Sequence, residues 1–272
     1  MVSIDVIGIF LFIFGAMVGS FLNVCIVRMP LEQSIVVPRS HCFKCQKMIP
    51  WFDNIPLISY WILGGQCRYC KEKFSIIYFL VELLTAVVFY LMYVYFGLSK
   101  FYLPYVFMMS CFIVATFVDF AHRIIPDEIS VGGMIFGLIF SFFIPEMHGL
   151  QAIAGFDWLI HLKSLGWSLV GVLAGGGSIY LMGLLGDMLF KKESMGGGDV
   201  KLLAMVGAFL GWKLAILTFF LAPLFGAVYG LVEKIRTKDS TIAYGPFIVL
   251  GAIISLFFGP PIIVWILNGY RL

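Results

Sequence analysis

Eight apolar segments dominate this sequence, and most are long enough for a helix to cross a lipid bilayer. They cover approximately residues 6–27, 76–97, 101–118, 129–145, 164–190, 200–212, 214–232 and 245–267. About 20 helical residues span the hydrocarbon core, where a helix satisfies its own backbone hydrogen bonds. Hydrophobic residues make up 61% of the chain and charged residues 12%, about half the charged fraction of a soluble domain. The sequence therefore predicts an all-α, polytopic membrane protein with about eight transmembrane helices.

The distribution of Lys and Arg predicts the orientation of these segments. If all eight cross the membrane, one set of loops holds fourteen of the 18 basic residues and the opposite set holds four. Loops rich in Lys and Arg stay in the cytoplasm, so the richer set is expected there and both termini outside. The first segment has no basic residue before it and no small-residue cleavage site after it, so we expect a retained helix. The net charge of +3 then reflects orientation and does not indicate nucleic-acid binding.

The segment 200–212 is too short to span the bilayer comfortably. Its 13 residues give a helix of about 20 Å, against a hydrocarbon core of about 30 Å. Either neighbouring helices shield this short helix, or it enters the membrane without crossing. The charge distribution favours crossing, because Lys213 would otherwise join the cytoplasmic group.

The polar loop 28–75 carries two cysteine pairs in the stretches SHCFKC and GQCRYC. The pairs are Cys42 with Cys45 and Cys67 with Cys70, separated by 21 residues, one more than the usual zinc-ribbon spacing. Four thiolates suit a closed, tetrahedral Zn²⁺ site, and disulfides are rare in the cytoplasm. A loop of this size buries little core, so a structural zinc ion is expected to stabilise it. Two redox pairs or idle thiols are the alternatives.

Several carboxylates lie at the expected cytoplasmic ends of apolar segments, where a charged group is costly and often functional. Asp127 follows Pro126 at a helix start and Asp187 lies near a helix end, so both have simple structural explanations. Asp119 ends a helix, at the pole that disfavours a negative charge. Asp199 follows three glycines, which permit close approach of the backbone to another chain. Two aspartates that face each other and share a proton would form a hydrolytic dyad.

These motifs together resemble the bacterial type IV prepilin leader peptidases, which belong to the GxGD class of intramembrane aspartyl proteases. The stretch GGGD at residues 196–199 is similar to the GxGD element, and DFAHRIIPD at residues 119–127 is similar to the second catalytic element. GSFLNVCIVRMP at 19–30, DNIPLISY at 53–60 and the cysteine pairs resemble the N-methyltransferase region of the bifunctional form. The resemblance implies that Asp119 and Asp199 are the catalytic pair. Phe43, Phe79 and Ser194 stand where the family commonly has other residues, and none is a candidate ligand or catalytic carboxylate.

The resemblance also implies an activity and a division of the chain. Residues 1–100 would form a methyltransferase-type region and residues 101–272 the peptidase domain. The enzyme would sit in the bacterial inner membrane, cleave prepilins or pseudopilins of pilus and type II secretion systems after a glycine, and methylate the new N-terminal residue. S-adenosylmethionine would supply the methyl group.

The cofactor site is the least defined part of this interpretation. No glycine-rich βαβ motif occurs, so a Rossmann-type pocket is not expected. The resemblance points to Gly65 and Glu82 as cofactor-binding residues, although Gly65 also suits a turn and Glu82 a helix start. A peptidase without methyl transfer is one alternative. A transporter that binds ions through Asp119 and Asp199 is another, although no internal repeat supports it.

Overall fold

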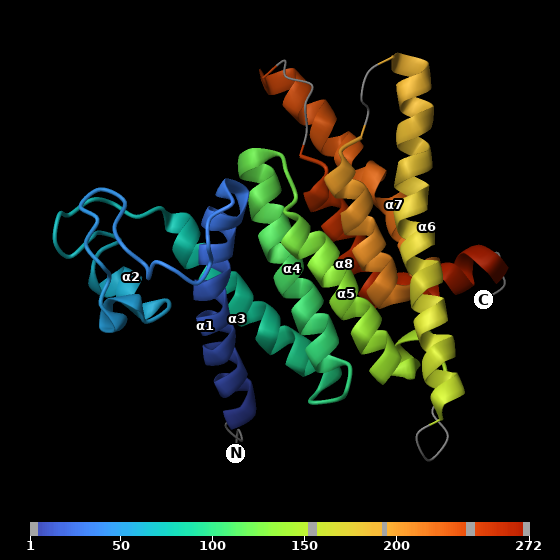
Figure 1. Cartoon of the computed structure of the whole chain (residues 1–272), viewed down its shortest axis with the longest axis horizontal. Coiled ribbons are helices and arrows are strands. Elements are labelled where there is room, and N and C mark those ends of the chain that lie inside the picture. The colour runs from blue at the N-terminus through green and yellow to red at the C-terminus, as the bar shows by residue number, and fades with distance from the viewer. Residues whose placement is uncertain (1–4, 152–156, 192–194, 238–242, 269–272) are drawn as a thin grey trace. The chain divides into compact units, whose positions relative to one another are not determined.

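The computed structural model describes residues 5–151, 157–191, 195–237 and 243–268 (Figure 1). These residues form helices and loops, with two isolated β-bridges in the loop 28–75 as the only extended pairing among them. Two compact units divide the chain, residues 1–114 and residues 115–272.

Unit 1 is built on two long antiparallel helices, α1 (Val6–Arg28) and α3 (Ile76–Phe96). Glycines on α1 let the two backbones approach closely. A Cβ atom at Gly19 would lie 2.7 Å from Cα of Glu82, and one at Gly15 would lie 2.9 Å from Cα of Ala86. Small residues serve this purpose in membrane helix pairs. The side chain of Ser75 caps the start of α3 by accepting a hydrogen bond from Ile77 N–H.

The loop between α1 and α3 contains only short elements. These are the 3-10 turns η1 (Met29–Leu31) and η2 (Trp51–Asn54) and the helix α2 (Ile58–Ile62). α4 (Tyr102–His122) begins in unit 1 and ends in unit 2.

Unit 2 continues with α5 (Asp127–Phe143), the 3-10 turn η3 (Pro145–His148), α6 (Trp158–Phe190), α7 (Gly197–Thr237) and α8 (Gly245–Asn268). α6 packs against the first part of α7 through glycines. A Cβ atom at Gly171 would lie 2.1 Å from the carbonyl oxygen of Gly207, and one at Gly175 would lie 2.3 Å from that of Leu203. Hydroxyl groups add hydrogen bonds between helices, from Ser168 Oγ to Ala208 O and from Thr218 Oγ1 to Ser255 Oγ.

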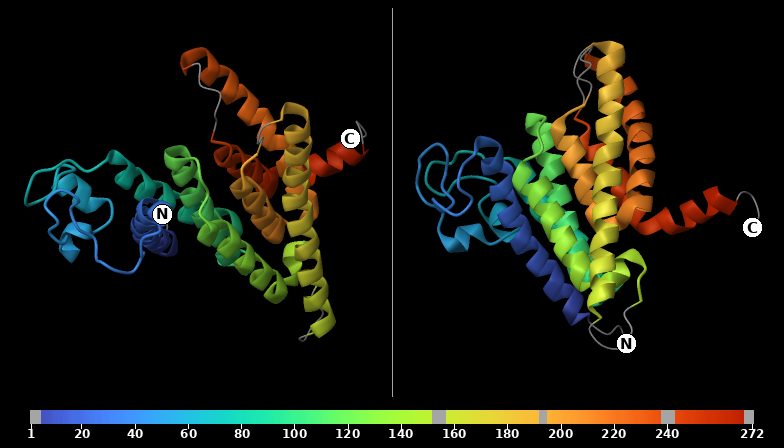
Figure 2. Two further views of the ribbon diagram at one scale, coloured as in Figure 1. Left: turned by 45° about the horizontal axis from the view of Figure 1, so that its top comes forward. Right: turned by 45° about the vertical axis from the view of Figure 1, so that its right-hand side comes forward.

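α7 contains two of the predicted apolar segments, joined at Gly211. The φ angle of Gly211 is 76°, a left-handed value that favours glycine and breaks the helix. The second half runs back alongside α8, as the proximity of Gly226 to Phe247 and of Gly259 to Leu214 shows. Figures 1 and 2 show this reversal. The first half, residues 197–210, spans about 21 Å, and residues 202–210 are buried throughout. This burial agrees with the first of the two alternatives, in which neighbouring helices shield the short helix.

The eight predicted apolar segments therefore all lie on helices of the described residues. Within the described residues, six helices are long and apolar enough to cross a membrane: α1, α3, α4, α6, α7 and α8. α5, with 17 residues, and the division of α7 into two halves account for the other two segments. α8 contains Pro260 and Pro261, and Figure 2 shows its C-terminal part turning away from the first part. The chain is an all-α, multi-pass membrane protein, as predicted.

Candidate active site and metal centre

The four cysteines of the loop 28–75 come together in unit 1. Their sulfur atoms all lie within 4.8 Å of one another. Cys42 Sγ lies 3.6 Å from Cys70 Sγ, and Cys45 Sγ lies 3.9 Å from Cys67 Sγ. Four thiolates bound tetrahedrally to Zn²⁺ at about 2.3 Å lie about 3.8 Å apart. The sulfur positions therefore suit a tetrahedral metal ion.

Each cysteine pair lies on a tight hairpin, which we call a knuckle, and the two knuckles (residues 40–49 and 65–74) are built alike. Three backbone hydrogen bonds close the first knuckle. Three more close the second, and each joins the residues that lie 25 positions after those of its counterpart. They run from Cys42 N to Lys47 O, Gln46 N to Cys42 O and Ile49 N to Ser40 O, and from Cys67 N to Glu72 O, Lys71 N to Cys67 O and Phe74 N to Gly65 O. The β-bridges His41–Met48 and Gln66–Lys73 follow the same spacing. Gly65 is thus the counterpart of Ser40.

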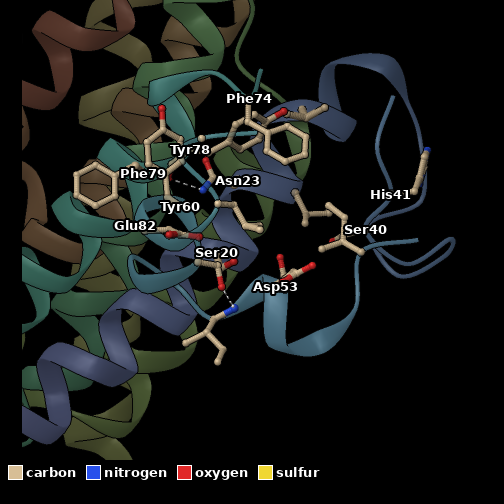
Figure 3. Close-up of a pocket in the computed structure, with 18 of the residues that line it drawn as sticks. Ser20, Asn23, Ser40, His41, Asp53, Tyr60, Phe74, Tyr78, Phe79 and Glu82 are labelled. Carbon is tan, nitrogen blue, oxygen red and sulfur yellow. Dashed lines mark hydrogen bonds between the residues drawn. The ribbon is translucent and has the colours of Figure 1, made fainter. Parts of the chain in front are cut away.

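A cleft of about 160 Å³ opens beside the knuckles (Figure 3). Equivalent positions of the two knuckles line it, together with residues of α1, α3 and the segment 53–63. The equivalent residues are Ser40, His41 and Ile49 in the first knuckle and Gly65, Gln66 and Phe74 in the second, and the first knuckle also contributes Phe43. Gly65 has a φ angle of 65°, and a Cβ atom there would lie 2.9 Å from the ring of Tyr60. Both the backbone conformation and the space require glycine at this position.

Glu82 of α3 also lines the cleft and holds a strained turn in place. Its Oε2 accepts a hydrogen bond of 2.8 Å from Leu57 N–H. Leu57 has a φ angle of 63° and a ψ angle of −49°, and Ile58 N–H donates to Pro56 O across it. This three-residue turn is rare and costs free energy. Both predicted cofactor-binding residues, Gly65 and Glu82, therefore contribute to one cleft.

The two carboxylates that line the cleft, those of Asp53 and Glu82, differ in their partners. Arg68 Nε donates a hydrogen bond of 2.6 Å to Asp53 Oδ2, and a second bond joins the same two side chains. This pairing lowers the pKa of Asp53, mainly through the hydrogen bond from Arg68. Among the described residues, no Lys or Arg forms an ion pair with Glu82. Glu82 therefore has no basic partner among the described residues, and its carboxylate accepts the hydrogen bond from Leu57 N–H.

The two predicted catalytic aspartates lie on different helices of unit 2 and interact electrostatically. Asp119 lies on the last turn of α4 and is only 5% exposed. Its Oδ2 accepts a hydrogen bond of 2.8 Å from Gly245 N–H, at the start of α8. Asp199 lies in the first turn of α7. Tyr244 is next to this pair: burial and then the charge of Asp199 raise its pKa to about 12, so it stays an uncharged phenol.

Of the three glycines before Asp199, Gly198 makes a close contact with the connection between α4 and α5. A Cβ atom at Gly198 would lie 3.1 Å from Cβ of Ile125. Gly196 and Gly197 are exposed, and nothing lies within 4 Å of a Cβ atom at Gly197. Gly198 thus allows the start of α7 to approach the segment that follows Asp119.

The other candidate carboxylates are more exposed than Asp119 and Asp199. Asp127 opens α5 and forms an ion pair with Lys201, with Nζ 2.7 Å from Oδ1. Both side chains are largely exposed. Asp187 is exposed near the end of α6. Asp127 at a helix start agrees with the structural explanation given for it from the sequence.

Sequence reasoning missed three contributors to these sites. Gly245 appeared only as the beginning of an apolar segment, although Pro246 beside it is typical of the first turn of a helix. Lys201, the partner of Asp127, appeared only as a basic residue in the charge count. Ser40 became recognisable as a cleft residue only in the three-dimensional structure, where it lines the cleft.

Comparison with known proteins identifies two matching family models. The model described as "Bacterial Peptidase A24 N-terminal domain" matches residues 13–96, and the model described as "Type IV leader peptidase family" matches residues 106–231. None of the solved structures matches the chain significantly.

Curated relatives carry the name prepilin leader peptidase/N-methyltransferase. One from Bacillus subtilis is 30% identical over 93% of this chain and 95% of its own length, and one from Pseudomonas aeruginosa is 32% identical over 91% and 89%. One from Myxococcus xanthus is 36% identical over 85% of this chain, but the match spans only 64% of that protein. With two family models in succession and relatives matched along most of their length, this chain belongs to the type IV leader peptidase family.

Proposed function

We propose that this chain is a bifunctional membrane enzyme. It removes the leader peptide of type IV prepilins or pseudopilins after a glycine, and it methylates the new N-terminal residue, usually phenylalanine. The observation that carries the peptidase function is a shared neighbour of the two aspartates: Gly245, which donates to Asp119, and Gly198, which precedes Asp199, both lie against Ile125. The name shared by the relatives supports both activities.

In the peptidase reaction, the two aspartates act as general acid and base. One ionised carboxylate activates a water molecule, and the protonated partner polarises the scissile carbonyl group. Neither residue forms an acyl-enzyme. The open backbone at Gly196 and Gly197 leaves room for an extended substrate beside Asp199.

A structural zinc ion is the metal that the four cysteines fit. Four sulfur ligands fill a tetrahedral shell and leave no open position for a substrate. Cys42, Cys45, Cys67 and Cys70 would hold it, and the zinc would fix the two knuckles relative to each other.

The cleft of unit 1 is the proposed S-adenosylmethionine site. That cofactor supplies an electrophilic methyl group on a positively charged sulfur. Glu82 offers an anion without a basic partner among the described residues, and Tyr60, Phe74 and Phe79 supply aromatic faces that attract cations. The residues that line the cleft therefore fit the cofactor, with Gly65 keeping the wall beside Tyr60 open.

Replacing Glu82 by glutamine is expected to weaken cofactor binding. The substitution removes the negative charge and keeps the side-chain oxygen that accepts from Leu57 N–H. Equilibrium binding of S-adenosylmethionine to purified protein should weaken about tenfold or more, as expected for loss of a charge-assisted contact. Prepilin cleavage should stay within about twofold, since Glu82 belongs to unit 1. Unchanged cofactor binding would remove Glu82 from the proposed site.

The charge distribution supports an inner-membrane location with the loop 28–75 and both aspartates on the cytoplasmic side. A reporter that is active only in the cytoplasm should be active when fused after Lys191 and inactive when fused after Lys163. The opposite pattern of activity would show that the orientation is reversed.

One assay separates this proposal from its two rivals. Detergent-solubilised protein is incubated with a prepilin and with S-adenosylmethionine labelled in the methyl group. Cleavage with transfer of label supports the bifunctional enzyme. Cleavage without label supports a peptidase alone, and the absence of both leaves an ion transporter as the remaining candidate.

A further inference from the structure

The buried carboxylate of Asp119 has a specific hydrogen-bond donor far away in the sequence. Gly245 N–H lies 2.8 Å from Asp119 Oδ2, and the bond is buried. Gly245 lies beyond residue 231, where the match to the family model ends. Asp119 stands on the last turn of α4, where the helix dipole disfavours a negative charge. A donor from another helix compensates for this position.

The first turn of α8 leaves this N–H group free for Asp119. Pro246 has no N–H, and the N–H groups of Phe247 and Ile248 donate to Tyr244 O at 3.0 and 3.3 Å. Gly245 N–H is therefore the donor of this turn that reaches the aspartate. The first turn of a helix commonly satisfies such groups with an acceptor from elsewhere.

Space explains why this position is a glycine. A Cβ atom at residue 245 would lie 2.8 Å from Asp119 Oδ2 and 3.1 Å from Cδ1 of Ile125. The φ angle of Gly245 is not in the left-handed region, so its backbone conformation does not demand glycine. Any side chain would force either the Asp119 carboxylate or the start of α8 to shift.

Ile125 connects this contact to the second aspartate. It is 8% exposed, and it packs against Gly245 on one side and Gly198 on the other. Asp199 directly follows Gly198. The buried side chain of Ile125 thus contacts both Gly245, the donor to Asp119, and Gly198, the neighbour of Asp199.

We propose that Gly245 is a positioning residue for the peptidase reaction. Its N–H group orients the Asp119 carboxylate toward Asp199, and its lack of a side chain lets α8 approach the pair. This inference rests on the proposed peptidase function. Such a bond fixes the rotamer of the carboxylate, and preorganised geometry of this kind lowers the reaction barrier.

Gly245→Ala is expected to lower kcat for prepilin cleavage by about tenfold or more, with little change in KM. The acid limb of the pH–rate profile should move to higher pH, because an N–H donor stabilises the ionised form of a carboxyl group. The charged groups that interact with Asp119, namely Arg123 and Asp199, are unchanged in this variant. Gly132→Ala is the matched control, since nothing lies within 4 Å of a Cβ atom there.

An amide-to-ester substitution at Gly245 removes the N–H group without adding a side chain, so it decides the question even if Gly245→Ala fails to fold. The same substitution at Phe247 removes a donor from the same turn whose acceptor is Tyr244 O. The Gly245 ester should lose kcat and shift the acid limb, and the Phe247 ester should do neither. Wild-type kinetics in the Gly245 ester would overturn the positioning role. If the wild-type protein cleaved no prepilin, the proposed function itself would fail.

Discussion

Asp119→Asn and Asp199→Asn are each expected to lower prepilin cleavage by at least about 100-fold, the contribution of a positioned acid or base. Asparagine keeps the size of the side chain but neither accepts nor releases a proton. Because Asp119 is buried and Asp199 is partly buried at a helix start, the neutral amides should not destabilise unit 2. Both variants should accumulate in the membrane. Cleavage is measured as the mobility shift of a purified prepilin.

Asp127→Asn and Asp187→Asn are the matched controls, and both should retain much more activity. Asp127 loses an exposed ion pair with Lys201, which contributes at most about 1 kcal/mol. Methyl transfer to a substrate that is already cleaved should survive in all four variants, because the proposed cofactor cleft lies in unit 1. An inactive Asp187→Asn with an active Asp119→Asn would show that the catalytic pair is assigned wrongly.

The fold was largely predictable because membrane solvent restricts the choice of structure. Apolar segments in hydrocarbon must be helical, and all eight lie on helices. The separate segments 200–212 and 214–232 predicted that the chain reverses between them, but not that Gly211 makes the reversal. Gly211 is one of four glycines between residues 200 and 232, and nothing in the local sequence marks it as the point where the helix breaks. The packing of α6, through Gly171 and Gly175, is what encloses the first half of α7. Tertiary contacts of this kind are not encoded in local periodicity.

The candidate catalytic pair could be named from its motifs, whereas its supporting contacts could not. Asp119 and Asp199 stand beside recognisable sequence elements. Gly245 reaches Asp119 across 126 residues, and its local sequence signals only the start of a helix. The glycines at 196–198 were correctly read as allowing close approach, but only the structure shows that Gly198 is the one in close contact.

The cleft of unit 1 shows a signal that was present in the sequence and overlooked. The stretches SHCFKCQKMI and GQCRYCKEKF align without gaps at a spacing of 25 residues, and their identical hydrogen-bond patterns follow from this repeat. The spacing of the cysteines predicted the metal ligands. The lining of the cleft by Ser40 and Gly65 required the three-dimensional arrangement of the two knuckles.

That arrangement links the metal centre to the cleft. Each knuckle contributes equivalent residues to the wall, and the two sulfur pairs meet between the knuckles. Backbone hydrogen bonds close each knuckle on itself, so the relative position of the two knuckles depends strongly on the shared metal. Binding energy at such a site is also folding energy.

Cys67→Ser is therefore expected to remove most of the metal and to open the cleft. Purified wild-type protein should hold about one zinc ion per chain. The variant should lose most of it, because a three-sulfur site loses both charge and closure. The loop 28–75 should become protease-sensitive in the variant, while the membrane helices stay inserted. Binding of S-adenosylmethionine and methyl transfer should fall further than cleavage, since the aspartates lie in unit 2. Cys111→Ser, which alters a buried cysteine outside the cluster, should keep its zinc. Full zinc content in Cys67→Ser would rule out the four-sulfur site.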